Sequence, residues 1–354
     1  MIVKRLSFII VIVVVSLFLA SSAYADGSPF TDVPVDCEYY GAVLDLYDRG
    51  IIVGDEQGKF RPDANLTKAE QDKMFALAFK DAGIAWNDQN QDEVTVVSFY
   101  SELLRRAGYK PYLPSYKRIS EDQLLRAASI LCCPQYRYSY NHYDTAATQV
   151  SRKEAVSAIS RILSYDSLDM IALKDRLRVE VQESFGRSKK LEEQQINDAL
   201  LDVARLPRNI VDQFNECGYK VVFNDKKISE YRSNHNVNCT AYIDYVSKEI
   251  CMNTYVEDYA ILHEFGHFYN RNMDSKYMEK NNHMEEFEKL LANSLLSDYA
   301  STNRAEYFAE YFSLWFLGSI DLPAERMEMA KAGPETFKWF KELESAGWPM
   351  ESVK

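Results

Sequence analysis

Apolar residues spaced three and four positions apart predict helices through most of the first half of the chain. Between residues 29 and 79, this spacing gives a helical stretch, a glycine-rich connection and a second helical stretch. The second stretch opens with Thr67 and Glu70, which together form the pattern of a capping box. Residues 150–154 lead into another run of apolar residues at helical spacing and predict a further helix. In the second half of the chain, Thr254 and Glu257 form the pattern of a second capping box.

The hydrophobic pattern changes in the second half. Helical spacing extends over 171–185 and over 191–214, where Pro207 predicts an interruption. Short runs rich in β-branched and aromatic residues then predict strands over 219–223, 240–245 and 249–252, the last two forming a hairpin. Residues 165–168 between the halves are expected to be a linker. The order of elements predicts an α+β fold, with a helical domain followed by a domain that contains a small sheet.

Residues 1–25 have the pattern of a secretory signal. Lys4 and Arg5 precede an apolar run, and small residues around Ala25 form a cleavage site. A retained membrane anchor is the alternative, but the uncharged core is short for a spanning helix. We therefore expect a secreted, extracellular protein that begins near Asp26 and has no membrane contact after signal cleavage.

Charge and size narrow the classes of function. The full chain has a net charge of −12, and removal of residues 1–25 takes away Lys4 and Arg5 but no acidic residue, which leaves −14. An acidic chain is a poor nucleic-acid binder, so no nucleic-acid partner is expected. The 354 residues, 47% of them hydrophobic, predict a folded protein of two or more domains. Its 6 cysteines leave both disulfides and buried free thiols open.

The strongest chemical motif is H-E-x-x-H, formed by His263, Glu264 and His267. On a helix, residues four apart lie on the same face, so both imidazoles can bind one Zn²⁺ ion. The carboxylate of Glu264 lies one position away and can act as a general base without binding the metal. The alternative interpretation is that these residues fell together by chance on an amphipathic helix.

A catalytic zinc site needs a third protein ligand, and His283 and Glu306 are the downstream candidates. A metzincin would have a histidine six residues after His267, but Met273 occupies that position. A glutamate on a later helix is therefore favoured. Glu306 also lies three residues after Asn303, so it could instead close a capping box.

The segment 26–84 resembles an S-layer homology repeat. The matching positions, in the order of that family, are Phe30, Asp32, Val33, Tyr40, Gly50, Ile51, Gly54, Gly58, Phe60, Pro62 and Thr67 to Glu70. Residues 85–165 are expected to hold degenerate copies, with corresponding helix starts at Ser120 and Ser151.

That resemblance implies attachment to secondary cell-wall polysaccharide. In the family, a Thr-Arg pair at the start of the second helix takes part in holding the acidic polymer. Thr67, Lys68 and Arg152 are the corresponding candidates here. Lys68 cannot form the two parallel hydrogen bonds that arginine makes to a carboxylate. The alternative is a helical domain that keeps the architecture without the binding function.

Residues 166–354 resemble the catalytic domain of anthrax lethal factor and the secreted Pro-Pro endopeptidases. The resemblance lies in residues 262–268, in Tyr299 and in residues 302–312, and it continues through 334–339. It implies a zincin-type domain in which Glu306 is the third zinc ligand and Tyr299 lies over the metal. The interval of 39 residues from His267 to Glu306 is closer to that of the endopeptidases than to that of the toxin. Glu310, one turn after Glu306, is a candidate to orient His263 or His267.

Three functions follow as hypotheses. The first is a zinc endopeptidase of the gluzincin type, attached to the cell wall, that cleaves protein or peptide substrates on the cell surface, with a Pro-Pro preference implied only by the family. The second is a structural wall-binding protein with an inactive protease-like half. The third is a toxin-like protease acting on host proteins, which the wall-binding repeats disfavour.

Overall fold

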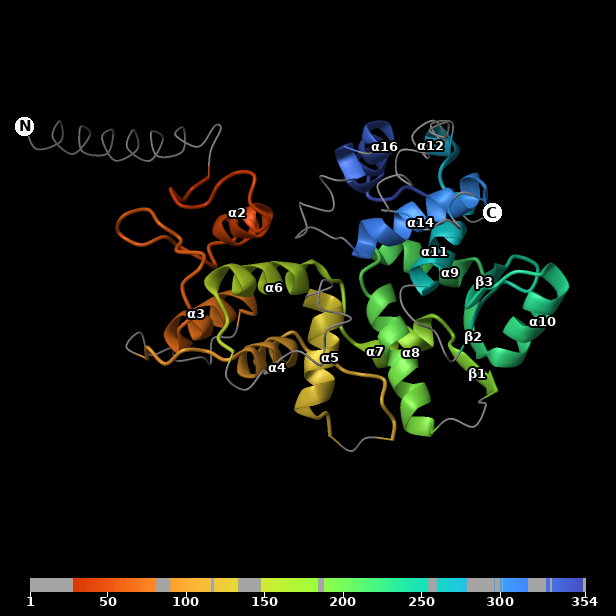
Figure 1. Cartoon of the computed structure of the whole chain (residues 1–354), viewed down its shortest axis with the longest axis horizontal. Coiled ribbons are helices and arrows are strands. Elements are labelled where there is room, and N and C mark those ends of the chain that lie inside the picture. The colour runs from red at the N-terminus through yellow and green to blue at the C-terminus, as the bar shows by residue number, and fades with distance from the viewer. Residues whose placement is uncertain are drawn as a thin grey trace, which may run out of the picture.

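The computed structural model describes residues 28–80, 90–115, 118–132, 148–183, 188–253, 260–278, 296, 300, 302–317, 329–331 and 333–352. The expected signal segment 1–25 and Tyr299 therefore lie outside the described residues. Within the described parts of the chain, no helix has the length and apolar character needed to cross a membrane. Figure 1 shows the first helices on one side of the molecule, and the sheet with the remaining helices on the other.

The N-terminal half is helical. Its elements are α2 (Tyr40–Asp48), α3 (Lys68–Ala78), α4 (Val96–Arg106), α5 (Glu121–Cys132) and α6 (Arg152–Ser164). The predicted capping box of Thr67 and Glu70 at α3 is confirmed, and Ser151 and Glu154 form another one at α6, each through reciprocal hydrogen bonds. The box predicted at Thr254 and Glu257 lies outside the described residues. Helix α2 packs against α6, and α4 packs against α5.

Three segments of this half are joined by a closed ring of backbone hydrogen bonds. The N–H of Leu66 donates to Val150 (2.7 Å), that of Val150 to Val94 (2.9 Å), and that of Val94 to Leu66 (3.0 Å). The next residue in each segment, Thr67, Thr95 or Ser151, caps the helix that follows. The ring therefore gives three helix starts equivalent positions around one axis.

This arrangement differs from the sequence expectation for the second copy. Ser120 was expected to correspond to Thr67, but it precedes α5 and takes no part in the ring, where Thr95 occupies the equivalent position. Ser120 and Gln123 do exchange the hydrogen bonds of a cap. A capping pattern identifies the start of a helix but not which helix of a repeat it begins, and this explains the difference.

Arg152 connects the last of these helices to the first segment. Its Nε donates to the carbonyl of Phe60 (2.7 Å), its guanidinium lies 4.9 Å from the centre of the Phe60 ring, and it also forms an ion pair with Glu70. Only 9% of Arg152 is exposed. The residue therefore holds two segments of the helical domain together.

The second half begins with α7 (Met170–Arg176), β1 (Glu180–Glu183), α8 (Lys189–Val203) and α9 (Arg208–Glu216). The predicted break near Pro207 is confirmed, since that residue precedes the first turn of α9. The helix predicted over 171–185 is wrong beyond Arg176. Arg178 has a left-handed backbone (φ 50°), which ends the helix, and the chain then enters β1, a short polar edge strand without the usual apolar signal.

A four-stranded sheet forms the centre of this half. Besides β1 it contains β2 (Lys220–Asn224), β3 (Ala241–Asp244) and β4 (Glu249–Met252), in the order β1-β2-β4-β3. β1, β2 and β4 are parallel, while β3 is antiparallel to β4, which confirms the predicted hairpin. Helix α10 (Asp225–His235) connects β2 to β3. Strand β3 is thus an edge strand of the sheet.

The remaining helices are α11 (Ala260–Asn272), α12 (Ser275–Met278), α14 (Arg304–Leu317) and α16 (Pro334–Ser345). Helices α11 and α14 make a close contact at Gly266, where an added Cβ would lie 2.8 Å from the Cα of Ala309. Aromatic rings pack beside this contact, including Tyr269 and Phe312 with centroids 5.6 Å apart. A glycine is therefore required for these two backbones to come so close.

The two halves meet through polar contacts between α8 and the N-terminal half. The side chain of Asn197 accepts from the backbone N–H of Tyr112 (2.9 Å), Glu193 accepts from that of Ser115 (2.9 Å), and Asp198 pairs with Arg126 (2.6 Å). The expected linker over 165–168 contains no helix or strand, but its end is fixed because Lys110 donates to the carbonyl of Leu168 (2.9 Å). The halves consequently share one packed interface.

We predict that Arg152→Ala lowers the free energy of unfolding by about 1.5–3 kcal/mol, because it removes hydrogen bonds from a buried charged group. Urea unfolding followed by circular dichroism measures this change. Arg49→Ala is the matched control, since Arg49 forms a solvent-exposed pair with Asp45 on α2. Its loss is expected to cost less than about 1 kcal/mol. Equal effects of the two substitutions would contradict the structural role of Arg152.

We further predict that Gly266→Ala destabilises the protein by about 1–3 kcal/mol, because the new methyl group forces α11 and α14 apart. Gly41 in α2 has no neighbouring atom within 4 Å of the place that a methyl group would take, so Gly41→Ala serves as the control. That control is expected to be neutral or to stabilise by up to about 1 kcal/mol, since alanine favours helices. Thermal unfolding of both variants provides the test, and an unchanged midpoint for Gly266→Ala would refute the packing argument.

Candidate metal centre

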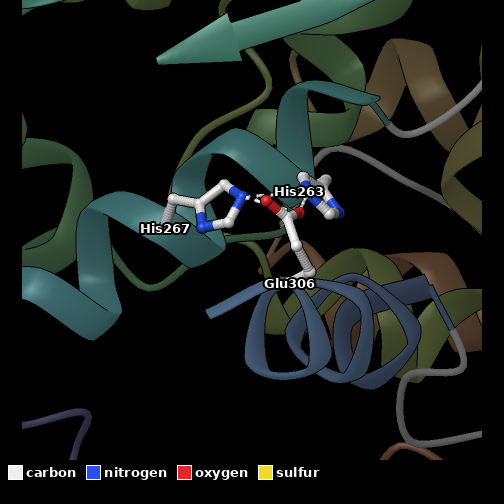
Figure 2. A group of neighbouring side chains, drawn as sticks. All are labelled: His263, His267 and Glu306. Carbon is white, nitrogen blue, oxygen red and sulfur yellow. Dashed lines mark hydrogen bonds and ion pairs between the residues drawn. The ribbon is translucent and has the colours of Figure 1, made fainter. Parts of the chain in front are cut away.

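Two packed helices bring three possible metal ligands together. His263 and His267 lie one turn apart on α11, and Glu306 lies in the first turn of α14. Figure 2 shows the carboxylate of Glu306 reaching from α14 towards the two imidazoles. One oxygen of Glu306 lies 2.9 Å from Nε2 of His263 and 3.1 Å from Nε2 of His267, and the two nitrogens are 3.0 Å apart. The side chains thus converge on one point.

The size and composition of this cluster fit a zinc ion. Bonds of about 2.0–2.1 Å to nitrogen and oxygen in a tetrahedral site place neighbouring ligand atoms about 3.3–3.4 Å apart. The three measured separations are only a few tenths of an ångström shorter. Among the described residues, this trio forms a group that could hold a metal ion. Three protein ligands would leave one position of a tetrahedral site for a substrate or water.

The ligands also influence each other's protonation. Burial lowers the pKa of His263, but hydrogen bonds to Glu306 and Glu310 and nearby negative charges raise it to about 10 overall. Burial raises the pKa of Glu306, yet its contacts with the two imidazoles lower it to about 2. Glu306 therefore stays ionised at any physiological pH, as a metal ligand must be.

Glu310 lies next to the first imidazole rather than the second. One of its oxygens is 3.3 Å from Nδ1 of His263, the nitrogen that does not face Glu306. A carboxylate in this position fixes the orientation of the ring and leaves the other nitrogen to face the metal position. The sequence allowed either histidine as the partner of Glu310.

Glu264 is almost completely buried, with 6% of its surface exposed. Burial raises the pKa of its carboxyl group, although the charges of His263 and His267 and a backbone hydrogen bond from Ile243 oppose this effect. A carboxylate with a raised pKa binds a proton more readily near neutral pH, which suits a general base.

The side chain of Asn303 caps the start of α14. The side-chain oxygen of Asn303 accepts from the backbone N–H groups of Ala305 (2.9 Å) and Glu306 (3.2 Å). The carboxylate of Glu306 itself contacts the imidazoles. His283 and Tyr299 lie outside the described residues.

A cleft of about 520 Å³ opens over the three ligands. Its other wall comes from the end of α10, from the segment before β3 and from β3 itself, with Tyr231, Asn238, Cys239, Thr240, Ala241, Tyr242, Ile243 and Tyr245 as lining residues. The sequence predicts the strand over 240–245, but nothing in it marks Tyr231 as a residue of the cleft. An isolated tyrosine on a helix carries no motif, and only the fold brings it to the cleft.

The candidate wall-binding residues lie in the other half of the molecule. The hydroxyl of Thr67 accepts from the N–H of Glu70 as part of the cap, and Arg152 is buried. The side chain of Lys68 is 40% exposed and pairs with Asp72 at 2.6 Å. Of these three residues, Lys68 is therefore the most accessible to a polymer.

The sequence left open whether the cysteines form disulfides or remain free thiols, and the structure answers this for the described residues. Cys37, Cys217, Cys239 and Cys251 are free thiols in the described part of the chain, and Cys132 is buried. Cys133 lies outside it.

Comparison with known proteins identifies the N-terminal segment. A search of curated proteins found no match to the chain. Residues 29–70 match the family model of the S-layer homology domain, and they include α2 and the start of α3. Domains of this family bind secondary cell-wall polymers. The chain therefore carries an S-layer homology domain, which supports its association with the cell surface.

Proposed function

We propose that this protein is a secreted zinc-dependent endopeptidase of the gluzincin type, held at the cell surface by its S-layer homology domain. The observation that supports this most directly is the convergence of His263, His267 and Glu306 within hydrogen-bonding distance of one another. The buried Glu264 beside them provides the base that peptide hydrolysis requires.

Each residue then has a distinct role. His263, His267 and Glu306 would hold the ion, and Glu310 would fix the ring of His263. The ion would supply Lewis acidity, which polarises the scissile carbonyl and makes a water molecule more acidic. Glu264 would accept the proton of the attacking water and pass it to the leaving amine. From the family resemblance, Tyr299 would donate a hydrogen bond to the oxyanion that develops.

The edge of β3 offers a binding surface for an extended peptide. The N–H of Asn253 donates to Thr240, so Thr240, Tyr242 and Asp244 direct their backbone groups towards β4. Ala241 and Ile243 alternate with them and direct their N–H and C=O groups away from β4, along the cleft, where the N–H of Ile243 donates to Glu264. A substrate strand paired with this edge would pass the metal position. A preference for Pro-Pro bonds rests on the family resemblance alone.

A catalytically inactive wall-binding protein is the second candidate. The match to the S-layer homology domain favours it, because that match concerns wall attachment and not hydrolysis. The two candidates differ in metal content, and stoichiometric zinc in the purified protein would favour the endopeptidase.

We predict that Glu264→Gln retains zinc but lowers the rate of peptide cleavage at least about 100-fold, since it removes the general base and no ligand. Glu306→Ala is the matched variant, and it should lose both zinc and activity because it removes a ligand. Elemental analysis gives the zinc content, and a fluorescence-quenched peptide library gives the cleavage rate. Full activity of Glu264→Gln would refute the proposed mechanism.

Zinc affinity is predicted to rise with pH. Because the pKa of His263 is about 10, its imidazole holds a proton at neutral pH, and the bound ion must displace that proton. One displaced proton gives about a tenfold gain in affinity per pH unit between about pH 7 and 8.5. Competition with a chromophoric chelator of known affinity measures the slope. An affinity independent of pH over that range would contradict the raised pKa.

A further inference from the structure

We propose that Tyr231, Tyr242 and His235, named here the aromatic column, form a specificity site for an uncharged, ring-bearing side chain of the substrate. This inference rests on the proposed endopeptidase function and deepens it. The column lies on the side of the cleft opposite the metal ligands, where Tyr231 and Tyr242 line the cleft.

The column is held by stacking. The rings of Tyr231 and Tyr242 are 4.1 Å apart and inclined by 11°, while those of Tyr231 and His235 are 4.3 Å apart and inclined by 26°. One face of a ring cannot hold two others at this spacing, so Tyr231 is covered on both faces. Its ring edge and its hydroxyl group are therefore the parts that remain for contact with another molecule. The stacking also restricts ring rotation, which lowers the entropy lost on binding.

The register of β3 explains why a substrate side chain would reach the column. Side chains alternate between the two faces of a strand, and Tyr242 lies on the face that α10 covers, since it stacks on Tyr231. A peptide added to the edge of β3 beside Ala241 and Ile243 would place every second side chain on that same face. One such side chain would lie beside Tyr242 and in front of Tyr231.

The charges in the cleft favour a neutral side chain at this point. All the imidazole and carboxyl groups of the lining, namely those of His263, Glu264, His267, Glu306 and Glu310, come from α11 and α14. The lining residues from α10 and from residues 238–245 carry no charged side chain. Aromatic edges bind best to the face of another ring, and an apolar ring makes that contact without losing hydration of a charge.

The hydroxyl group of Tyr231 adds a polar contact. Burial raises the pKa of Tyr231, with further contributions from the negative charges of Glu264 and Glu306. The phenol therefore stays protonated and can donate a hydrogen bond to a carbonyl of the bound peptide.

Peptide binding to the zinc-loaded Glu264→Gln protein tests the site without turnover. The probes are fluorescent octapeptides in which each position in turn carries Phe, Ala or Asp. We expect one position at which Phe binds more tightly than Ala or Asp. Tyr231→Leu in the same background should lower the affinity for that Phe peptide about three- to tenfold and leave its Ala and Asp counterparts unchanged. Tyr231→Phe, which retains the stacked ring, should keep the preference for Phe.

Tyr277 on α12 is the matched control, because it is also a partly exposed tyrosine in the same half but does not line the cleft. Tyr277→Leu should retain the full preference. The proposal is overturned if the Glu264→Gln protein shows no such preference, if Tyr231→Leu keeps it, or if Tyr231→Phe loses it. Zinc content is measured for every variant to separate local effects from loss of the fold. A protein that binds these peptides with the expected preference but cleaves none would refute the endopeptidase function and still support the site.

Discussion

The close approach of α11 and α14 at Gly266 and Ala309 is the constraint on which the candidate site depends. Two of the ligands belong to one helix and the third to the other, so the separation of the helices sets the size of the cluster. Any side chain at position 266 larger than hydrogen would meet the backbone of α14. Core packing and metal geometry are therefore determined by the same contact. The aromatic rings that pack beside this contact keep α11 and α14 in place.

The sequence predicted those parts of the molecule that depend on local chemistry. The capping box at Thr67 and the β3–β4 hairpin follow from patterns of a few residues, and the structure confirms them. The pairing of α11 with α14 is not local, and Glu306 was singled out from its spacing and a family resemblance rather than from contacts. β1 was missed because a short polar edge strand lacks an apolar signal, and Tyr231 because tertiary packing alone gives it a role.

The contact between the halves fixes the orientation of the S-layer homology domain relative to the cleft. Glu193, Asn197 and Asp198 fix α8 against the N-terminal half through directional hydrogen bonds. A flexible tether would let the cleft sample all orientations around its attachment point. The packed interface instead sets one orientation of the cleft relative to the helical domain, so the position of the attachment also limits which neighbouring surfaces the cleft can face.

The ring of hydrogen bonds among Leu66, Val94 and Val150 also has a consequence for folding. Its first and last members are separated by more than eighty positions, so the ring closes only after residue 150 has joined the folding chain. Contacts between such distant positions form slowly, because the entropy of loop closure is lost before the contact forms. The earliest helices of the N-terminal half therefore keep their apolar faces exposed until the last helix has folded. That interval is the stage at which this domain is most open to aggregation or proteolysis.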